Sequence, residues 1–297
     1  MIDVCICIVS WNGTGLLRTC LESVVGCTSR VSFSVVVVDN ASTEDVVGMV
    51  RKEFSQAEVI ANTSNLGFGK ANNQALQLYS GKARYFLLLN PDTVIERGAI
   101  DNIVEYMDER KDAGIAGCKL VLPDGTLDWP CKRAFITPSM FFYRALGLDT
   151  RFPKSPRFGR YQLTYLDENE LHEVDSVVGA FLLIRSETVN QIGLMDEQFF
   201  MYGEDLDWCY RAREANWKVV YYPYAQVVHH KGQSSAKQSY RMIYWWYRAL
   251  WMVYRRHCAN RYLFFVNWAV WSGLYGMCLA SLTRNLFRKK KGVPSRR

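Results

Sequence analysis

Residues 33–42 of the 297-residue chain read Phe-Ser-Val-Val-Val-Val-Asp-Asn-Ala-Ser. Four consecutive valines leave no polar face, as expected for a central strand of a parallel sheet that is covered on both sides. The polar residues behind the valines predict a turn at the point where the strand ends. This stretch therefore predicts an α/β fold, in which helices cover both faces of a mostly parallel central sheet.

Strand and helix patterns alternate over the first 120 residues, which is typical of successive β-α-β units. The predicted strands are Asp3–Ser10, Phe33–Asp39, Glu58–Ala61, Tyr85–Leu89 and Ile115–Leu122, with a further pair at Ser176–Ile184 and Trp217–Tyr221. The predicted helices are Gly15–Val25, Thr43–Phe54, Lys70–Tyr79, Glu96–Arg110 and Glu204–Asn216. Residues 123–175, rich in Pro, Arg and aromatic side chains, predict an irregular excursion that could form a lid over a site.

Charge is divided unevenly along the chain. Residues 229–297 hold 14 Lys or Arg and no Asp or Glu, which leaves 22 basic and 29 acidic residues in residues 1–228. A basic tail on an acidic body predicts an anionic partner for the tail, either a membrane or a nucleic acid. The nine cysteines are scattered and mostly lie in apolar stretches, which predicts buried thiols in a reducing compartment. The first strand lacks the pattern of a signal peptide, so we expect a cytoplasmic body.

Polar residues stand where the predicted parallel strands end, at Ser10-Trp11-Asn12, Asp39-Asn40-Ala41-Ser42 and Asn90-Pro91-Asp92. Doubly wound sheets bind their ligands at the carboxyl ends of the strands. The chain has neither the Gly-rich dinucleotide motif nor a phosphate-binding loop of the Walker type. A nucleotide could still be held by its base and ribose, with Asp39 as hydrogen-bond acceptor and Trp11 nearby. The alternative for Asp39 is the cap of the helix that follows.

Two further groups of acidic and basic side chains carry candidate chemistry. Asp92 is placed to hold a divalent cation that neutralises a diphosphate leaving group, and His229 could add a neutral ligand or be purely structural. In Gly203-Glu204-Asp205-Leu206-Asp207, a helix that starts at Glu204 would place Asp207 and Arg211 four residues apart on one face. These acids indicate either base or metal chemistry or an ordinary helix cap with a salt bridge.

As a set, these motifs resemble family 2 glycosyltransferases of the GT-A fold, and within that family the bacterial rhamnosyltransferase-like enzymes of surface polysaccharide assembly. The resemblance covers about residues 3–235 in the family's order. The motifs that carry it are Ser10-Trp11-Asn12, Val38-Asp39-Asn40-Ala41-Ser42, Asn65-Leu66-Gly67-Phe68-Gly69 with Asn72-Asn73, Leu89-Asn90-Pro91-Asp92, Gly179-Ala180, Gly203-Glu204-Asp205-Leu206-Asp207 with Arg211, and His229 with Gly232 and Ser234.

The resemblance implies an inverting transfer of a sugar from a nucleotide-diphosphate donor to a polyprenyl-diphosphate-linked saccharide, for cell-surface polysaccharide. L-Rhamnose from dTDP-rhamnose is the first choice of donor, and a UDP-hexose is the alternative. A catalytically silent sugar-nucleotide-binding or scaffold protein is an alternative of another class. The resemblance also implies a GT-A catalytic domain over residues 1–235, with a nucleotide-sugar half at about 1–122 and an acceptor half at about 123–235.

By the same resemblance, Asp205 is the general base and Glu204 contacts the acceptor, although the two roles could be exchanged. A divalent cation, Mg²⁺ or Mn²⁺, would be held by Asp92 and His229; Asn90 departs from an Asp-x-Asp motif, so the site has one negative charge fewer. The expected donor-binding residues are Ser10, Trp11, Asn12, Asp39, Asn40, Ser42, Asn65, Gly67, Phe68, Lys70, Asn73, Asn90 and Asp92. The residues expected on the acceptor side or as orienting groups are Gly179, Ala180, Asp207 and Arg211.

The basic tail, residues 236–297, mixes aromatic side chains with Arg at near-helical spacing from Tyr240 onward, which favours a membrane interface. Residues 262–283 are uncharged and long enough to span a bilayer. Basic residues flank both ends of that segment, which opposes a single span in a protein with a cytoplasmic body.

We therefore expect in-plane helices or a re-entrant hairpin near Gly273–Gly276. Such a tail would attach a peripheral or monotopic protein to the anionic cytoplasmic face of the inner membrane. A core helix or a homodimer interface is the alternative role for the tail. The long uncharged run argues against a nucleic-acid partner.

Overall fold

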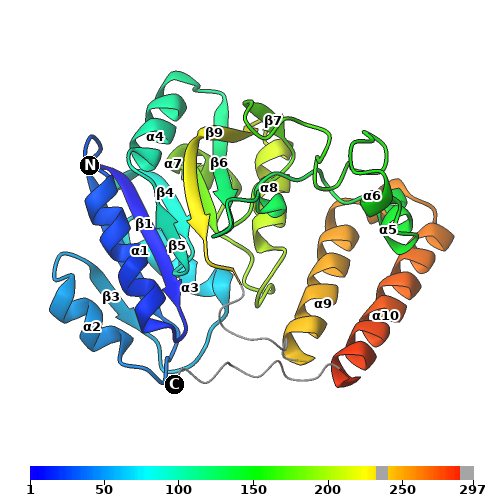
Figure 1. The fold of residues 1–297 in the computed structure, drawn as a ribbon, viewed down its shortest axis with the longest axis horizontal. Helices are drawn as coiled ribbons and strands as arrows, with labels where there is room; N and C mark the ends of the chain where they lie inside the picture. Colours follow the sequence, from blue (N-terminus) through cyan, green and yellow to red (C-terminus); the bar gives the residue numbers. More distant parts are fainter. Residues whose placement is uncertain (232–239, 288–297) are drawn as a thin grey trace.

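The computed structural model describes residues 1–231 and 240–287, and Figure 1 shows a central sheet with helices packed around it and two long helices at one side. The strands are β1 (Ile2–Ser10), β2 (Phe33–Asp39), β3 (Glu58–Ala61), β4 (Ala83–Leu89), β5 (Thr93–Ile95), β6 (Ala113–Val121), β7 (His172–Val174), β8 (Phe181–Arg185) and β9 (Lys218–His229). The helices are α1 (Thr14–Cys27), α2 (Val46–Glu53), α3 (Phe68–Leu78), α4 (Ala99–Glu109), α5 (Pro138–Ala145), α6 (Leu148–Arg151), α7 (Ser186–Ile192), α8 (Glu204–Glu214), α9 (Tyr240–His257) and α10 (Phe264–Phe287). The α/β class predicted from the sequence is confirmed.

The sheet has the strand order β3-β2-β1-β4-β8-β6-β9-β5, and β7 pairs with β9. Strands β3, β2, β1, β4, β6 and β9 run in one direction, whereas β8, β5 and β7 run in the opposite one. The sheet is therefore mixed but mostly parallel. Because β8 is antiparallel and lies between β4 and β6, its first residues stand at the edge where the parallel strands end.

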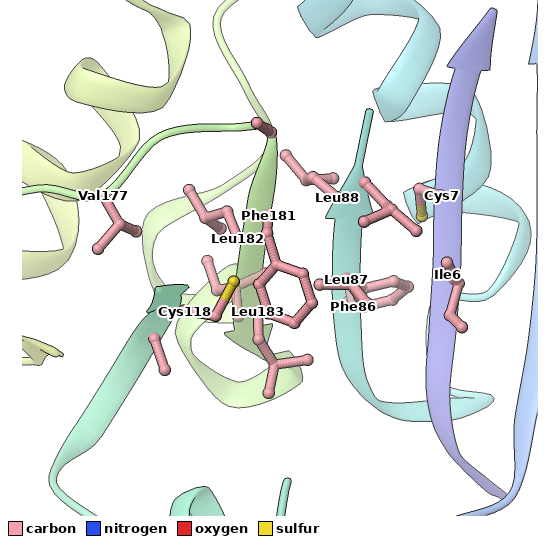
Figure 2. Close-up of a cluster of buried hydrophobic side chains, with 14 of the residues drawn as sticks. Ile6, Cys7, Phe86, Leu87, Leu88, Cys118, Val177, Phe181, Leu182 and Leu183 are labelled. Carbon is pink, nitrogen blue, oxygen red and sulfur yellow. The ribbon is translucent and has the colours of Figure 1, made fainter. Parts of the chain in front are cut away.

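The core of the sheet is apolar on both faces. Val36, Val37 and Val38 of β2 are fully buried, as the run of valines predicted. In Figure 2 the side chains of β8, among them Phe181 and Leu183, lie between β4 and β6. All nine cysteines are free thiols, and seven of them are buried.

Strand β9 is longer than the predicted Trp217–Tyr221, and the difference matters for the site. Its pairing with β6 shifts register between Tyr222 and Gln226, so Pro223 lies in an irregularity of the strand. A proline cannot donate to a ladder and is tolerated at such a bulge. The strand resumes after the bulge and carries His229 to the carboxyl edge of the sheet.

Two other predictions need correction in this half of the chain. The strand expected from Ser176 begins only at Phe181, and Ser176 instead bridges Arg133 in an isolated antiparallel pair. Residues 123–175 are less irregular than expected, because they contain the short helices α5 and α6 and the strand β7. Strand β5, three residues long, was also not predicted.

The two C-terminal helices form a hairpin, but its turn is at residues 258–263 and not at Gly273–Gly276. The re-entrant turn expected at those glycines is wrong, since both lie inside the continuous helix α10 and neither has a positive φ. Each glycine costs a helix only about 1 kcal/mol relative to alanine, which the surrounding apolar residues offset. The predicted domain boundary at residue 235, with Gly232 and Ser234, and the basic residues Arg288–Lys291 lie outside the described residues.

Candidate active site

The carboxyl ends of β1 and β2 lie side by side and carry the first two predicted motifs. Ser10 is in register with Asp39, and the Asn40 amide donates to the Ser10 carbonyl at 2.8 Å. The Asn12 amide donates to Ser42 Oγ at 2.7 Å, which joins the two turns. Trp11, between them, leaves 61% of its surface exposed, so its indole is available to a planar ligand.

Asp39 does not cap the helix that follows it, so the alternative role considered for this residue is wrong. The cap of α2 is Asp45, whose carboxylate accepts from the Gly48 amide at 2.8 Å. The Asp39 carboxylate instead accepts from the hydroxyl and the amide of Ser42 and shapes the turn at the end of β2.

Asn40 and Asn65 shape the loop that leads into α3. Asn40 Nδ2 donates to the Gly67 carbonyl at 3.0 Å, and the Gly67 amide donates to Asn65 Oδ1 at 2.9 Å. Gly67 has φ +84°, and a Cβ there would lie 2.3 Å from the Phe200 carbonyl oxygen. Because this φ and this contact both exclude a side chain, the predicted glycine is required by the backbone.

The first turn of α3 meets the segment before α8. The Phe68 amide donates to the Phe200 carbonyl at 2.8 Å, and Lys70 Nζ lies 3.4 Å from Glu197 Oε2. Asn73 is buried, and its side-chain amide bonds both the amide and the carbonyl of Met195. Asn73 therefore holds this segment in place, whereas the Lys70 side chain is exposed.

The two distant acids of the sequence analysis lie at the same edge of the sheet. The Asn90 amide donates to the Ala180 carbonyl at 3.0 Å, and the neighbouring Gly179 amide donates to Asp205 Oδ2 at 3.1 Å. A Cβ on Gly179 would lie 3.2 Å from the Phe68 ring, which is tighter than an ordinary van der Waals contact, so the absence of a side chain at this position favours the close approach of these segments. Asp205 is thus connected to the Asn90-Pro91-Asp92 turn through hydrogen bonds to two consecutive residues, Gly179 and Ala180.

Asp205 and Glu204 begin α8 and are both buried, at 6% and 5% exposure. Asp205 Oδ2 also accepts from Arg133 Nη2 at 2.7 Å, in an ion pair shielded from solvent. Glu204 Oε2 is buried, and no described residue offers it a hydrogen bond. Burial and the neighbouring charge of Asp205 raise the pKa of Glu204 to about 8, so Glu204 holds a proton at neutral pH.

Asp92 meets His229 at the end of β9. His229 Nε2 lies 3.3 Å from Asp92 Oδ1, and His229 Nδ1 lies 2.8 Å from Asp128 Oδ2. Lys231 Nζ lies 3.0 Å from Asp128 Oδ1. Burial alone would lower the pKa of His229, but hydrogen bonds to Asp128 and Asp92 outweigh it and raise the pKa to about 9. This part of the edge therefore favours a positive charge between two carboxylates.

Asp207 joins α8 to the C-terminal hairpin. The predicted pair with Arg211 is present, with Nε 2.9 Å from Asp207 Oδ2. Arg256 Nη1 and His257 Nε2 of α9 each lie 2.8 Å from Asp207 Oδ1. Burial alone would raise the pKa of Asp207, but these three partners hold it below its ordinary value. The helix that starts with Glu204 is thereby fixed to α9.

Comparison with known proteins agrees with this architecture. Residues 3–249 match the family model described as Glycosyltransferase like family 2.

The chain belongs to this glycosyltransferase family.

A relative from Mycobacterium tuberculosis, N-acetylglucosaminyl-diphospho-decaprenol L-rhamnosyltransferase, is 29% identical over 216 residues, which are 69% of this chain and 68% of the relative. Among solved structures, GalNAc-T7 with UDP, GalNAc and Mn²⁺ matches 86% of this chain with a TM-score of 0.61 and 16% identity. This chain spans only 48% of that protein. A second solved structure is the mannosyltransferase PcManGT from Pyrobaculum calidifontis in complex with GDP-Man and Mn²⁺. The match covers 96% of this chain and 76% of the PcManGT chain, with a TM-score of 0.59 and 15% identity. The two structures share the GT-A fold with this glycosyltransferase.

Two side chains of this glycosyltransferase site were not singled out from the sequence. Asp128 and Arg133 both come from residues 123–175, which carry no periodic pattern that would place them at the sheet edge. Their sequence neighbours offer no motif, and only the bridge between Arg133 and Ser176 and the extension of β9 bring them to Asp205 and His229.

In this glycosyltransferase, we expect Glu204→Gln to gain stability relative to the wild type as the pH rises. The folded-state pKa of Glu204, about 8, lies above its ordinary value of 4.5, so the stability contributed by the protonated carboxyl is complete below pH 4.5 and is lost as the pH rises through about 8. Glutamine has the shape of the protonated acid and does not titrate. Thermal unfolding of both proteins at about pH 5 and about pH 9 measures the difference.

The exposed Glu187→Gln change is the matched control for a Glu-to-Gln replacement. A difference in Tm between Glu204→Gln and the wild type that stays the same at both pH values would contradict the buried, protonated state of Glu204.

Proposed function

We propose that this glycosyltransferase moves L-rhamnose from dTDP-L-rhamnose to a polyprenyl-diphosphate-linked saccharide, with inversion at the anomeric carbon. The name of the Mycobacterium tuberculosis relative supports the sugar and the lipid-linked acceptor. The observation that carries the proposal is the pair of hydrogen bonds that brings Asp205 and the Asp92 turn to one edge of the sheet. A UDP-hexose is the alternative donor, and a panel of nucleotide sugars separates the two.

The donor would lie across the ends of β1, β2 and β4. The exposed indole of Trp11 offers a face for stacking on the base, and Asp39 offers a carboxylate to the base or the ribose. Ser10, Asn12 and Ser42 build the turn that presents them. Asn40, Asn65 and Gly67 shape the loop that brings Phe68 against Gly179, close to Asp205.

The residues at the end of β9 fit a divalent cation. GalNAc-T7 and PcManGT were both crystallised with Mn²⁺. His229 would offer Nε2 beside Asp92 while Nδ1–H donates to Asp128, which is the arrangement that orients many histidine ligands. Within residues 1–231 and 240–287, no three His, Cys, Asp or Glu side chains form a metal site by themselves. Diphosphate oxygens of the donor would therefore supply the other ligands.

The chemistry is a single displacement. The acceptor hydroxyl oxygen forms a bond to the anomeric carbon, the bond from that carbon to the diphosphate breaks, and its electron pair leaves with the diphosphate. Asp205 accepts the hydroxyl proton, which is the work of a general base. A bound divalent cation would neutralise the charge that develops on the diphosphate. Asp207 and Arg211 hold the helix that carries Asp205, and Glu204 lies beside it as a neutral group.

The C-terminal hairpin would hold the enzyme at the cytoplasmic face of the inner membrane. Helix α10 is the one described helix long and apolar enough to cross a bilayer. It exposes a stripe of large apolar side chains spaced three or four residues apart, and the basic side chains of both helices supply positive charge for an anionic surface. The stripe consists of Phe264, Trp268, Trp271, Tyr275 and Leu279.

Asp205→Asn is expected to lower sugar transfer by about 10²-fold to 10⁴-fold, because it removes the general base. Donor binding should be retained, since asparagine keeps the shape of the side chain. Transfer to a short-chain polyprenyl-diphosphate saccharide, together with thermal shifts for a panel of nucleotide sugars, measures both properties. Unchanged turnover in Asp205→Asn would reject the base, and the absence of any stabilising nucleotide sugar would reject the transferase in favour of a scaffold.

Asp128→Asn is expected to weaken Mn²⁺ binding about 10-fold to 100-fold in the presence of a nucleoside diphosphate, because His229 loses the carboxylate that orients it. Titration calorimetry with Mn²⁺ and dTDP or UDP measures the affinity. Asp124→Asn is the control, because among the described residues the Asp124 carboxylate bonds the nearby Thr126 and not His229. Equal affinity in the wild type and Asp128→Asn would contradict the assignment of His229 as a ligand.

Trp268→Ser and Trp271→Ser are each expected to weaken binding to vesicles that contain anionic lipid. A large apolar side chain gains about 1.5–3 kcal/mol on leaving water, so each change should lower the partition coefficient about tenfold or more. Vesicle flotation measures it. Tyr224→Ser, at an equally exposed aromatic on β9, is the control. Vesicle binding that is insensitive to both tryptophans but falls in Tyr224→Ser would place the membrane surface elsewhere.

A further inference from the structure

Arg133 is a buried cation that no sequence motif marks. It follows the short turn at residues 129–131 and exchanges two backbone hydrogen bonds with Ser176, both at 2.9 Å. Its Nη2 donates at 2.7 Å to the Val177 carbonyl and at 2.7 Å to Asp205 Oδ2. The guanidinium is therefore fixed at both its backbone and its tip, and it points at the acid that begins α8.

Arg133 is the only cation that the described residues place in an ion pair with Asp205. The titratable groups near this pair are Glu204 and Cys209 on α8, Tyr161 beside Arg133, and Tyr202 beside Glu204. None of these other groups is cationic. Within the described residues, Asp205 is thus stabilised by one cation, the Arg133 guanidinium, together with the backbone amides of Gly179 and Leu206.

Burial makes this partnership energetically important. A carboxylate taken out of water is unstable without a partner, and two adjacent buried carboxyls tend to share one proton. Burial alone would lower the pKa of Arg133, but the charge of Asp205 raises it above its ordinary value, so the guanidinium stays charged. Glu204 makes no ion pair with any of the described residues, and none of them bonds its buried Oε2.

The hydrogen bonds around Asp205 also distinguish its two oxygen atoms. Oδ2 accepts from Arg133 Nη2 and the Gly179 amide, which uses both of its lone pairs. Oδ1 accepts from the Leu206 amide at 2.7 Å and keeps one lone pair. The oxygen that can receive a proton from a substrate is therefore Oδ1.

We propose that Arg133 is a positioning residue of the transfer reaction, which holds Asp205 as an oriented carboxylate so that Asp205 Oδ1, and not Glu204, accepts the acceptor's proton. This inference rests on the proposed glycosyl transfer. The acceptor hydroxyl gives its proton to Oδ1, its oxygen bonds the anomeric carbon, and the electron pair of the broken bond leaves with the diphosphate. Arg133 keeps its own protons throughout and touches neither substrate.

The test is the pH dependence of kcat in the wild type, Arg133→Met and Arg133→Lys, measured as sugar transfer. The base must be ionised to act, and loss of an adjacent cation raises a carboxyl pKa by about one to three units. The acidic limb of the profile should therefore move to higher pH by about one unit or more in Arg133→Met. Arg133→Lys keeps the charge and should shift less.

Lys132→Met is the matched control. Lys132 is the neighbouring residue, is also fully buried, and donates to the carbonyls of Leu163 and Leu166 without contacting Asp205. A purely structural role for Arg133 would lower kcat equally at all pH values, as a loss of packing in Lys132→Met should do. Donor affinity by thermal shift identifies variants that remain folded, and the neutral Arg133→Gln replaces Arg133→Met in this comparison if Arg133→Met does not fold.

An acidic limb that stays at the wild-type pH in both Arg133 variants would overturn this role while leaving the proposed function intact. A limb that moves equally in Lys132→Met would overturn it as well. A wild-type protein that transfers no sugar from any donor would overturn the proposed function together with this inference.

Discussion

The hydrogen bond from the Gly179 amide to Asp205 joins the two halves of the active site. It exists because β8 runs antiparallel between two parallel strands, so its leading residues stand at the edge where β1, β2 and β4 end. The adjacent Ala180 carbonyl holds Asn90 at the same edge. Gly179 also eases the approach of the Phe68 ring, since a Cβ there would lie 3.2 Å from the ring. The direction of β8 therefore brings Asp205, at the start of α8, to the same edge as the turns that follow β1, β2 and β4.

Buried charges organise the rest of the site. Arg133 balances Asp205, and His229 lies between Asp92 and Asp128. Asp207 has three partners, Arg211 on its own helix and Arg256 and His257 on α9. Because removing one partner of a buried pair leaves an uncompensated charge, each of these clusters resists local rearrangement. The same network fixes α8, which begins with Glu204 and Asp205, to the hairpin that we propose as the membrane anchor, so the proposed anchor and the proposed base are joined by one set of contacts.

Much of this arrangement follows from local sequence. The valine run, the polar strand ends and the Asp207–Arg211 spacing are local signals, and they predict the sheet, the turns at the strand ends and the start of α8. Asp128 and Arg133 depend on non-local pairing: a β-bulge at Pro223 that lengthens β9, and a bridge between residues 133 and 176. The spacing of apolar residues within one segment carries no information about contacts between segments that are distant in the sequence. The turn predicted at the glycines of α10 is wrong because a glycine permits a turn without requiring one. The large apolar side chains on either side of these glycines favour a continuous helix.

If Asp205 accepts the proton while the diphosphate departs, the two groups act on opposite faces of one sugar. The anomeric configuration of the transfer product, assigned by proton NMR from the first turnovers, measures this arrangement. Single displacement assisted by Asp205 predicts that the product has the anomeric configuration opposite to that of the donor. A product that keeps the donor's configuration would rule out single displacement.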